Sequence, residues 1–263
     1  MRDLVALAYE TLDGWLALGH ETLATPLARF VRERATPRVY DANFAARVRA
    51  ETPAEIEAVL AGLERVFEGF GHRHVWWDPA MPQPFEARLV LDGWRRQSDE
   101  VVQVLEGALA SRGPRVEIRP VESDEDWRTV EELQWLEHRE EAAKGLHPAW
   151  EREVTRQLVA AKRAKGPGVR TFLARWDGVD GAFFSAWPGE NGVGKVEDLF
   201  TRSELRGRGI ATALIAACVD DARARGAGPV LIGARADDTP KRMYASLGFR
   251  PLCVRRSYLR LRG

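Results

Sequence analysis

The sequence contains few cysteines, no excess of charge of one sign and no long apolar run. Its two cysteines, Cys218 and Cys253, lie far apart in apolar contexts, so we expect buried, reduced thiols and neither a disulfide framework nor a zinc site. The 39 basic and 39 acidic residues balance each other. This balance argues against a dedicated nucleic-acid-binding protein, because such proteins usually carry a basic excess.

The chain also lacks signals for membrane insertion and secretion. No apolar run reaches the length that spans a bilayer, and the first residues, with Asp3 among them, show no secretory cleavage pattern. We therefore expect a cytoplasmic protein without membrane or nucleic-acid partners. The 263 residues, 45% hydrophobic and 30% charged, suffice for one large domain or two small ones.

Alternating helix and strand signals predict an α/β or α+β fold. A turn-rich break at 111–114 divides the chain into residues 1–113 and 114–263. In the first part the pattern predicts helices over 1–34 (broken near Thr25-Pro26), 52–68 and 85–91, and strands over 39–48, 73–77 and 100–105. In the second part it predicts helices over 124–141, 148–162, 209–225 and 240–247, and strands over 116–119, 169–176, 182–187, 194–201, 230–235 and 253–261.

The segment 196–214 carries the most information about function. A predicted strand passes through the glycine-rich turn Arg206-Gly207-Arg208-Gly209 directly into an apolar helix. The glycines allow a ligand to approach the backbone closely, and the first turn of the helix presents unpaired N–H groups at the positive end of its dipole. With two guanidinium groups beside it, this arrangement favours a pyrophosphate site. The spacing fits neither a P-loop nor a dinucleotide fingerprint, and a basic turn before a core helix is the alternative.

Two motifs in this half resemble the GNAT superfamily of acyl-CoA N-acyltransferases. Arg206-x-x-Gly209-x-Ala211, between a strand and an apolar helix, is similar to the family's pyrophosphate motif. The segment Tyr244-Ala245-Ser246-Leu247-Gly248-Phe249 is similar to its Tyr-x-x-Leu-Gly-Phe segment. The resemblance covers about residues 116–263 and implies a mixed, mostly antiparallel central sheet flanked by helices.

The resemblance also implies the ligands. Acetyl-CoA is the implied cosubstrate, a small-molecule or peptide amine is the implied acceptor, and no metal is needed. The implied acetyl-CoA-binding positions are Leu199, Phe200, Thr201, Arg206, Gly207, Arg208, Gly209, Ile210, Ala211, Thr212 and Asp237. Asp237 stands where the family often has Asn, and an ionised Asp accepts hydrogen bonds but donates none.

Direct transfer to an amine requires a base, because an alkyl amine is protonated near pH 7. Glu197 is the candidate base, since strand alternation places it on one face with Leu199 and Thr201; Asp198, on the other face, is the second choice. By the resemblance, Tyr244 protonates the leaving thiolate. The alternatives are that the carboxylates are ordinary strand-end charges and that Tyr244 is a core residue. A non-catalytic acyl-CoA sensor is the alternative function.

The N-terminal half shows a strand and helix order over 39–105 that parallels 194–261. Where the glycine loop would be expected it has Arg49-Ala50-Glu51-Thr52-Pro53, and Pro53 lacks an N–H. We interpret this half as a degenerate GNAT-like copy that does not bind CoA, with an unrelated α/β or helical extension as the alternative. Three roles are open for it: extending the sheet, walling the substrate cleft or forming a homodimer contact.

Overall fold

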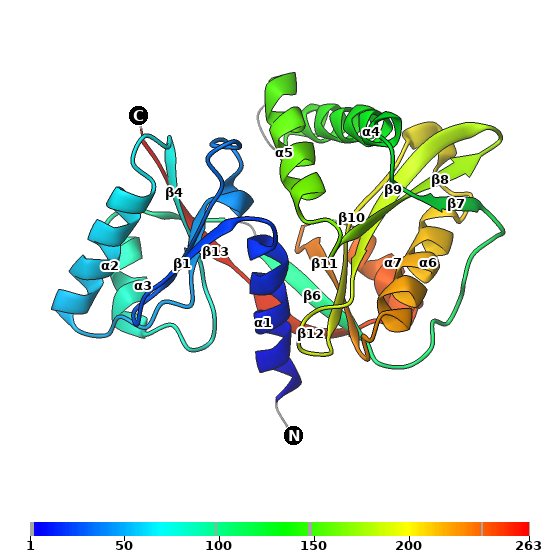
Figure 1. Ribbon diagram of the computed structural model, residues 1–263. Coiled ribbons are helices and arrows are strands. Elements are labelled where there is room, and N and C mark those ends of the chain that lie inside the picture. Colours follow the sequence, from blue (N-terminus) through cyan, green and yellow to red (C-terminus); the bar gives the residue numbers. More distant parts are fainter. Residues whose placement is uncertain (1–2, 98, 147–148, 238, 263) are drawn as a thin grey trace.

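The computed structural model describes residues 3–97, 99–146, 149–237 and 239–262. It contains two mixed sheets, each flanked by helices, that lie side by side (Figure 1). The predicted α+β class with mostly antiparallel sheets is confirmed. Across the described ranges, no helix combines the length and the apolar character that a membrane span needs.

The larger sheet has seven strands in the order β12-β6-β11-β10-β9-β8-β7. Its strands are β6 (Glu100–Leu105), β7 (Glu117–Pro120), β8 (Arg170–Trp176), β9 (Val179–Trp187), β10 (Gly194–Thr201), β11 (Val230–Arg235) and β12 (Arg250–Arg255). Neighbouring strands are antiparallel except β10 and β11, which α6 (Ile210–Ala224) connects as a parallel pair.

Helices cover both faces of this sheet. Alternation along β9 sends Phe184 toward α6 and α7 (Pro240–Ser246), and Phe183 toward α4 (Asp124–Ala143) and α5 (Arg152–Ala164). Helix α1 (Leu4–Ala17) packs on the same face as α4 and α5, where Leu12 meets Val104 and Leu231. The first helix of the N-terminal half is therefore part of the C-terminal core.

The smaller sheet has six strands in the order β1-β2-β3-β4-β13-β5. Its strands are β1 (Glu21–Ala24), β2 (Arg29–Arg32), β3 (Phe44–Ala46), β4 (His72–Trp76), β5 (Arg95–Arg96) and β13 (Ser257–Leu261). Helices α2 (Pro53–Val66) and α3 (Gln83–Leu91) pack on it around Leu63, Phe67 and Phe85. As predicted, α2 begins at Thr52-Pro53, where Thr52 and Glu55 form a capping box.

The two sheets have the same topology. The order β1-β2-β3-β4-β13-β5 has the same succession of antiparallel and parallel pairs as β8-β9-β10-β11-β6-β12. In both sheets the one parallel pair is bridged by a helix, α2 or α6. This agreement supports the interpretation of the N-terminal half as a degenerate copy.

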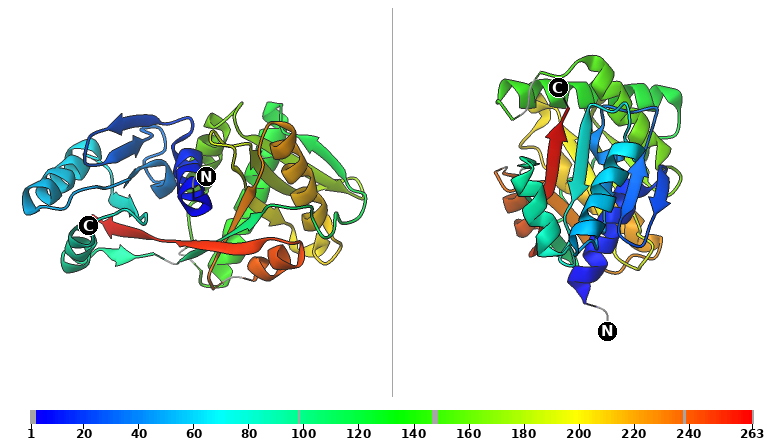
Figure 2. Two further views of the ribbon diagram at one scale, coloured as in Figure 1. Left: turned by 90° about the horizontal axis from the view of Figure 1, so that it is seen from below. Right: turned by 90° about the vertical axis from the view of Figure 1, so that its left-hand side faces the viewer.

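The halves exchange one strand each. Strand β6, from the N-terminal half, inserts between β11 and β12, and β13, from the C-terminal half, inserts between β4 and β5. Figure 2 shows the red β12 to β13 segment passing from one half to the other. A cut between residues 113 and 114 thus separates the sequence motifs but not the sheets, and that domain division stays a prediction.

Several predicted elements were wrong. Residues 21–32 are not helical but form the β1–β2 hairpin, whose turn is stabilised by Thr25 Oγ1, which accepts from Ala28 N at 3.0 Å. The strand expected over 39–48 is shorter, with the 3₁₀ turn η1 (Tyr40–Ala42) before β3. The strand expected over 253–261 is two strands, β12 and β13. The expected helix start at Pro148 lies outside the described residues.

Candidate functional site

The site forms where two parallel strands separate. Strands β10 and β11 pair from Gly194 with Val230 to Val196 with Ile232, although β10 continues to Thr201 and β11 ends only at Arg235. Beyond Val196 the described residues of the two strands no longer share ladder hydrogen bonds. The continuing part of β10 borders two adjoining cavities.

A bulge in β10 decides which side chains enter each cavity. The register with β9 shifts between Glu197 and Phe200, and Asp198 has a φ of 69°, a left-handed conformation uncommon for a residue with a side chain. The extra residue reverses the alternation, so Leu199 packs against the α6 core. The expected common face of Glu197, Leu199 and Thr201 is therefore wrong, as is the expected opposite orientation of Asp198: Glu197 and Asp198 both line the second cavity.

The first cavity has a volume of about 490 Å³ and lies at the N-terminal end of α6. It brings together most of the predicted acetyl-CoA-binding positions. Those that line it are Leu199, Phe200, Thr201, Arg206, Gly207, Gly209, Ile210, Ala211 and Thr212, joined by the predicted acid Tyr244. Three carboxylates of α4 also line it: Glu137, Glu140 and Glu141.

The glycine turn has the left-handed backbone that its sequence requires. Gly207 and Gly209 have φ values of 76° and 78°, and a Cβ on Gly209 would lie 2.7 Å from Pro114 Cδ. Helix α6 begins at Ile210, so the amides of its first turn face the cavity without carbonyl partners inside the helix. This geometry favours an anionic ligand at that end.

Arg206 reaches the same end of the cavity. Its Nε donates to the carbonyl of Thr201 at 2.9 Å, and its guanidinium pairs with Glu140 and lies 5.8 Å from the centre of the Phe200 ring. A phosphate ligand must therefore compete with Glu140 for this guanidinium.

Two predicted positions lie outside the cavity lining. Arg208 is exposed. Asp237 is held by Arg235, whose Nη2 donates to Oδ2 at 2.9 Å, and this hydrogen bond lowers the pKa of the carboxyl group. Neither residue therefore lines the first cavity with the other predicted cofactor positions.

Tyr244 borders the first cavity from α7. Its side chain is only 4% exposed and its ring lies 6.3 Å from the ring of Phe249. The Gly248 turn that follows the helix has a φ of 100°, which glycine adopts readily. The Tyr-x-x-Leu-Gly-Phe segment thus packs its own aromatic residues together and fixes the tyrosine at the cavity wall.

The second cavity, of about 410 Å³, lies between the two halves of the chain. Trp15, His20, Asp41 and Trp76 of the N-terminal half face residues of β10, α4 and α5. Glu141 lines both cavities, so they meet beside α4. The N-terminal half therefore walls the side of the site opposite the glycine turn.

Glu197 has the electrostatic environment of a group that titrates near neutrality. Burial, aided by repulsion from Glu100 and Asp198, raises its pKa to about 7, while Lys195, which contacts its carboxylate, acts in the opposite direction. Its side chain remains 26% exposed toward the cavity. A carboxyl group in this state can accept a proton from a substrate near pH 7.

Asp198 is in a different state. Burial acts to raise its pKa, but the ammonium groups of Lys162, Lys165 and Lys195 outweigh this and lower it. Lys162 Nζ lies 2.8 Å from its carboxylate. Asp198 is therefore a stably ionised partner of Lys162, which makes it a weaker base than Glu197.

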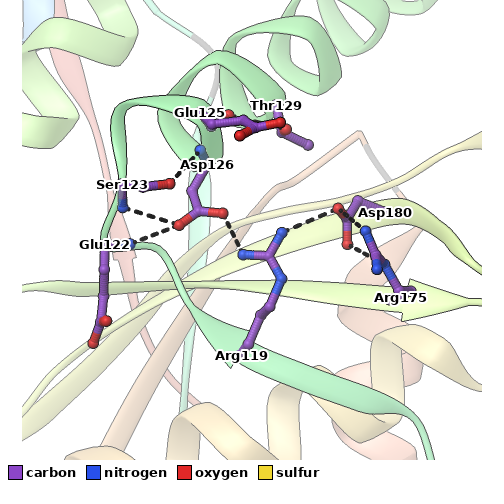
Figure 3. Close-up of polar contacts among 8 residues, drawn as sticks. All are labelled: Arg119, Glu122, Ser123, Glu125, Asp126, Thr129, Arg175 and Asp180. Atoms are coloured by element: carbon purple, nitrogen blue, oxygen red, sulfur yellow. Dashed lines mark hydrogen bonds and ion pairs between the residues drawn. The ribbon is translucent and has the colours of Figure 1, made fainter.

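Helix α4 is anchored by a polar cluster at its start (Figure 3). Ser123 and Asp126 form a capping box, and the Asp126 carboxylate accepts from the amides of Glu122 and Ser123 at 3.1 and 3.0 Å. Arg119 pairs with Asp126 and links it to Asp180 of β9 at 3.0 Å. These contacts fasten α4 to the sheet and so position the carboxylates it presents to both cavities.

Sequence reasoning missed several charged residues of the site, among them Glu137, Lys162 and Lys165. Burial raises the pKa of Glu137, on α4, to about 8, and it borders the first cavity. Lys162 and Lys165, at the end of α5, enter the second cavity. Helix α5 is polar along most of its sequence, so its buried cations cannot be distinguished from solvent-exposed ones without the tertiary structure.

Comparison with known proteins agrees with this geometry. Residues 127–249 match the family model described as the acetyltransferase (GNAT) family. These residues form a GNAT acetyltransferase domain. The resemblance noted from the two motifs is thereby confirmed, and this match supports acyl transfer as the general activity of the domain. No curated protein matches the sequence.

Solved structures similar to the whole chain include GNAT proteins. A GCN5-related N-acetyltransferase from Kribbella flavida shares 19% identity at a TM-score of 0.70, covering 100% of this chain and 97% of its own. A conserved protein of unknown function from Staphylococcus epidermidis shares 12% identity at a TM-score of 0.68, and the alignment covers 93% of this chain and 95% of that protein. A tandem GNAT protein from the clavulanic acid biosynthesis pathway shares 18% identity at a TM-score of 0.60, and the alignment covers 99% of this chain and 93% of that protein. These identities are low, so the similarity shows the fold of both halves and not a substrate.

Proposed function

We propose that the protein transfers an acetyl group from acetyl-CoA directly to the nitrogen of an amine. The observation that carries the proposal is the adjacency of two cavities at the split between β10 and β11. One is bordered by the N-terminal end of α6 and the other by Glu197. A donor in the first and an acceptor in the second meet at the bulge of β10.

In this proposal the GNAT domain binds acetyl-CoA in the first cavity. The pyrophosphate lies against the amides of Ile210, Ala211 and Thr212, with the Arg206 guanidinium beside them. The pantetheine arm follows residues 199–201, where β10 has left β11 and its main-chain groups face the cavity. One of these amides stabilises the oxygen of the thioester as it becomes negative.

The transfer itself needs a base and an acid. The amine nitrogen attacks the carbonyl carbon of the thioester, the new N–C bond forms, and the C–S bond then breaks. Glu197 takes a proton from the nitrogen, directly or through water, because its carboxylate faces the acceptor cavity. Tyr244 gives its hydroxyl proton to the departing sulfur and regains one from solvent.

Calorimetric titration with acetyl-CoA and a thiol-release assay over an amine panel test the proposal. We expect binding in the micromolar range, and CoA release with at least one amine. Arg206→Ala should weaken acetyl-CoA binding about tenfold, whereas Arg202→Ala, which removes an arginine outside the cavity lining, should not. Tyr244→Phe should lower kcat roughly 10- to 100-fold with little change in KM.

The outcomes separate the alternatives. Absence of any affinity for CoA or its thioesters would contradict the proposal. Tight binding without CoA release from any amine would instead favour an acyl-CoA sensor.

A further inference from the structure

The second cavity has the dimensions and the walls of a small-molecule site. Its 410 Å³ lie within the range of such sites. Trp15 and Trp76 come from the N-terminal half, and Trp150 comes from the segment before α5, where its ring lies 4.8 Å from that of His138. Aromatic walls from both halves favour an acceptor with a flat or apolar body.

Most of the cations in this cavity already have a carboxylate partner. The pairs are Lys162 with Asp198 (2.8 Å), Lys195 with Glu197, Arg255 with Glu100 (3.9 Å) and Arg235 with Asp237 (2.9 Å). These pairs leave little net charge for a ligand to neutralise.

Lys165 is the exception. Its ammonium lines the cavity and lies 4.9 Å from the centre of the Trp15 ring, and it forms no ion pair with any carboxylate of the described ranges. Burial is the main influence on Lys165 and lowers its pKa to about 8, so it stays mostly protonated at neutral pH. Asp198 and Asp41 attract this ammonium without contacting it. A partly buried cation with no carboxylate in contact is costly, and an anionic ligand group would relieve that cost.

The cavity wall carries charges of both signs close together. Glu197 and Asp198 offer carboxylates beside the bulge. Lys165 and Lys195 lie 4.9 and 5.8 Å from the centre of the same Trp15 ring, and Lys195 contacts Glu197. A ligand that carries an amine and an anionic group close together matches this arrangement, whereas a polycation would meet three ammonium groups.

We propose that the acceptor is a small amine that also carries one carboxylate, such as a free amino acid with an aromatic or apolar side chain, and that Lys165 binds the carboxylate. The amine then lies beside Glu197 and the side chain lies between the tryptophans. This inference rests on the proposed function and adds the class of acceptor. It also assigns a role to the N-terminal half, which supplies two of the aromatic walls.

Matched pairs of acceptors test the proposal in the full-length protein. Tryptophan is compared with tryptamine, and phenylalanine with phenethylamine, by CoA release at saturating acetyl-CoA. We expect kcat/KM to favour each amino acid about tenfold or more. Lys165→Met should lower that preference roughly tenfold through the KM of the amino acid, and Lys165→Arg should retain most of it.

Arg163→Met is the control, because Arg163 is also on α5 but pairs with Asp124 outside the cavity; it should leave the preference unchanged. Equal or better turnover of the amines without a carboxylate would overturn the inference, as would a preference that survives Lys165→Met. Intact acetyl-CoA binding with no CoA release from any pair also overturns this acceptor class. Loss of acetyl-CoA binding itself would instead refute the proposed function.

Discussion

At the scale of the residue, two carboxyl groups that line the cavities have raised pKa values and lie on different walls of the site. Glu197 lies in the strand that borders both cavities, and Glu137 lies on α4 at the first cavity. Only Glu197 lines the cavity assigned to the acceptor. Because the two residues line different cavities, a substitution of Glu137 is a control for the same substitution of Glu197.

Glu197→Gln should remove the acidic limb of the pH–rate profile, which is the fall in kcat/KM at low pH. A base must be deprotonated, so kcat/KM of the natural protein should fall as the pH drops below about 7, the raised pKa of this carboxyl group. The variant should lose about 100-fold at pH 8 and should no longer show this limb. Glu137→Gln should keep it. An unchanged limb in Glu197→Gln would exclude Glu197 as the base.

At the scale of the element, the turn before α6 depends on a backbone that only glycine adopts cheaply. Gly207 and Gly209 both have positive φ, but only Gly209 is close to a neighbour, 2.7 Å from the expected Cβ to Pro114 Cδ. Gly209→Ala should therefore weaken acetyl-CoA binding about tenfold through strain and displacement of the turn. A Cβ at Gly207 would meet open space, so Gly207→Ala should weaken acetyl-CoA binding less than Gly209→Ala. Equal losses of affinity would show that the contact with Pro114 is unimportant.

The cap of α4 is a second element with a specific expectation. Asp126→Ala removes two hydrogen bonds to main-chain amides and the pair with Arg119, so we expect the free energy of unfolding to fall by about 1–2 kcal/mol at pH 7. The neighbouring exposed Glu125→Ala should change it by less than about 0.5 kcal/mol. Thermal or urea unfolding measures both.

The same cap has a defined pH dependence. Hydrogen bonds from Ser123 lower the pKa of Asp126 below its ordinary value of 3.8. Its stabilisation is therefore complete above pH 4 and is lost as the pH falls toward the lowered value. The difference between the natural protein and Asp126→Ala should shrink below pH 3. A difference independent of pH would mean that packing, not ionisation, stabilises the cap.

The elements also show how far the sequence predicts the structure. The helix starts at Thr52-Pro53 and after Gly209, and the hairpin at Asp177-Gly178, could be predicted because their signals are local. The β1–β2 hairpin was predicted as helix because β1 is exposed along its whole length and so lacks the apolar alternation of a strand. The bulge at Asp198 was not predictable, since no glycine marks the left-handed position.

In the candidate site, too, the parts with local sequence signals were predictable and the parts assembled by tertiary packing were not. The glycine turn and Tyr244 lie in continuous motifs, and the structure brings them to one cavity. The second cavity assembles residues from α1, α4, α5 and β10, whose proximity depends on how the halves pack. Pairing of β6 and β13 across the halves carries no local sequence signal at all.

At the scale of the whole molecule, the exchanged strands should make the two sheets unfold together. Calorimetry should show one transition, and Leu259→Ala in β13 and Val102→Ala in β6, both buried, should each lower its midpoint by roughly 4–10 °C without dividing it. Leu23→Ala, which is 37% exposed on edge strand β1, should change it by about 1 °C or less. Two separate transitions would show that the exchange does not couple the halves.

The strand exchange also delays completion of the first sheet during protein synthesis. Glu64 of α2 and Arg260 of β13, which pair in the N-terminal half, are 196 positions apart. At a typical elongation rate of about 5–20 residues per second, the first sheet waits roughly 10 to 40 s for β13, the strand that lies between β4 and β5. During that interval β4 presents an open edge, so we expect the nascent chain to be prone to pairing with other strands until β13 is available.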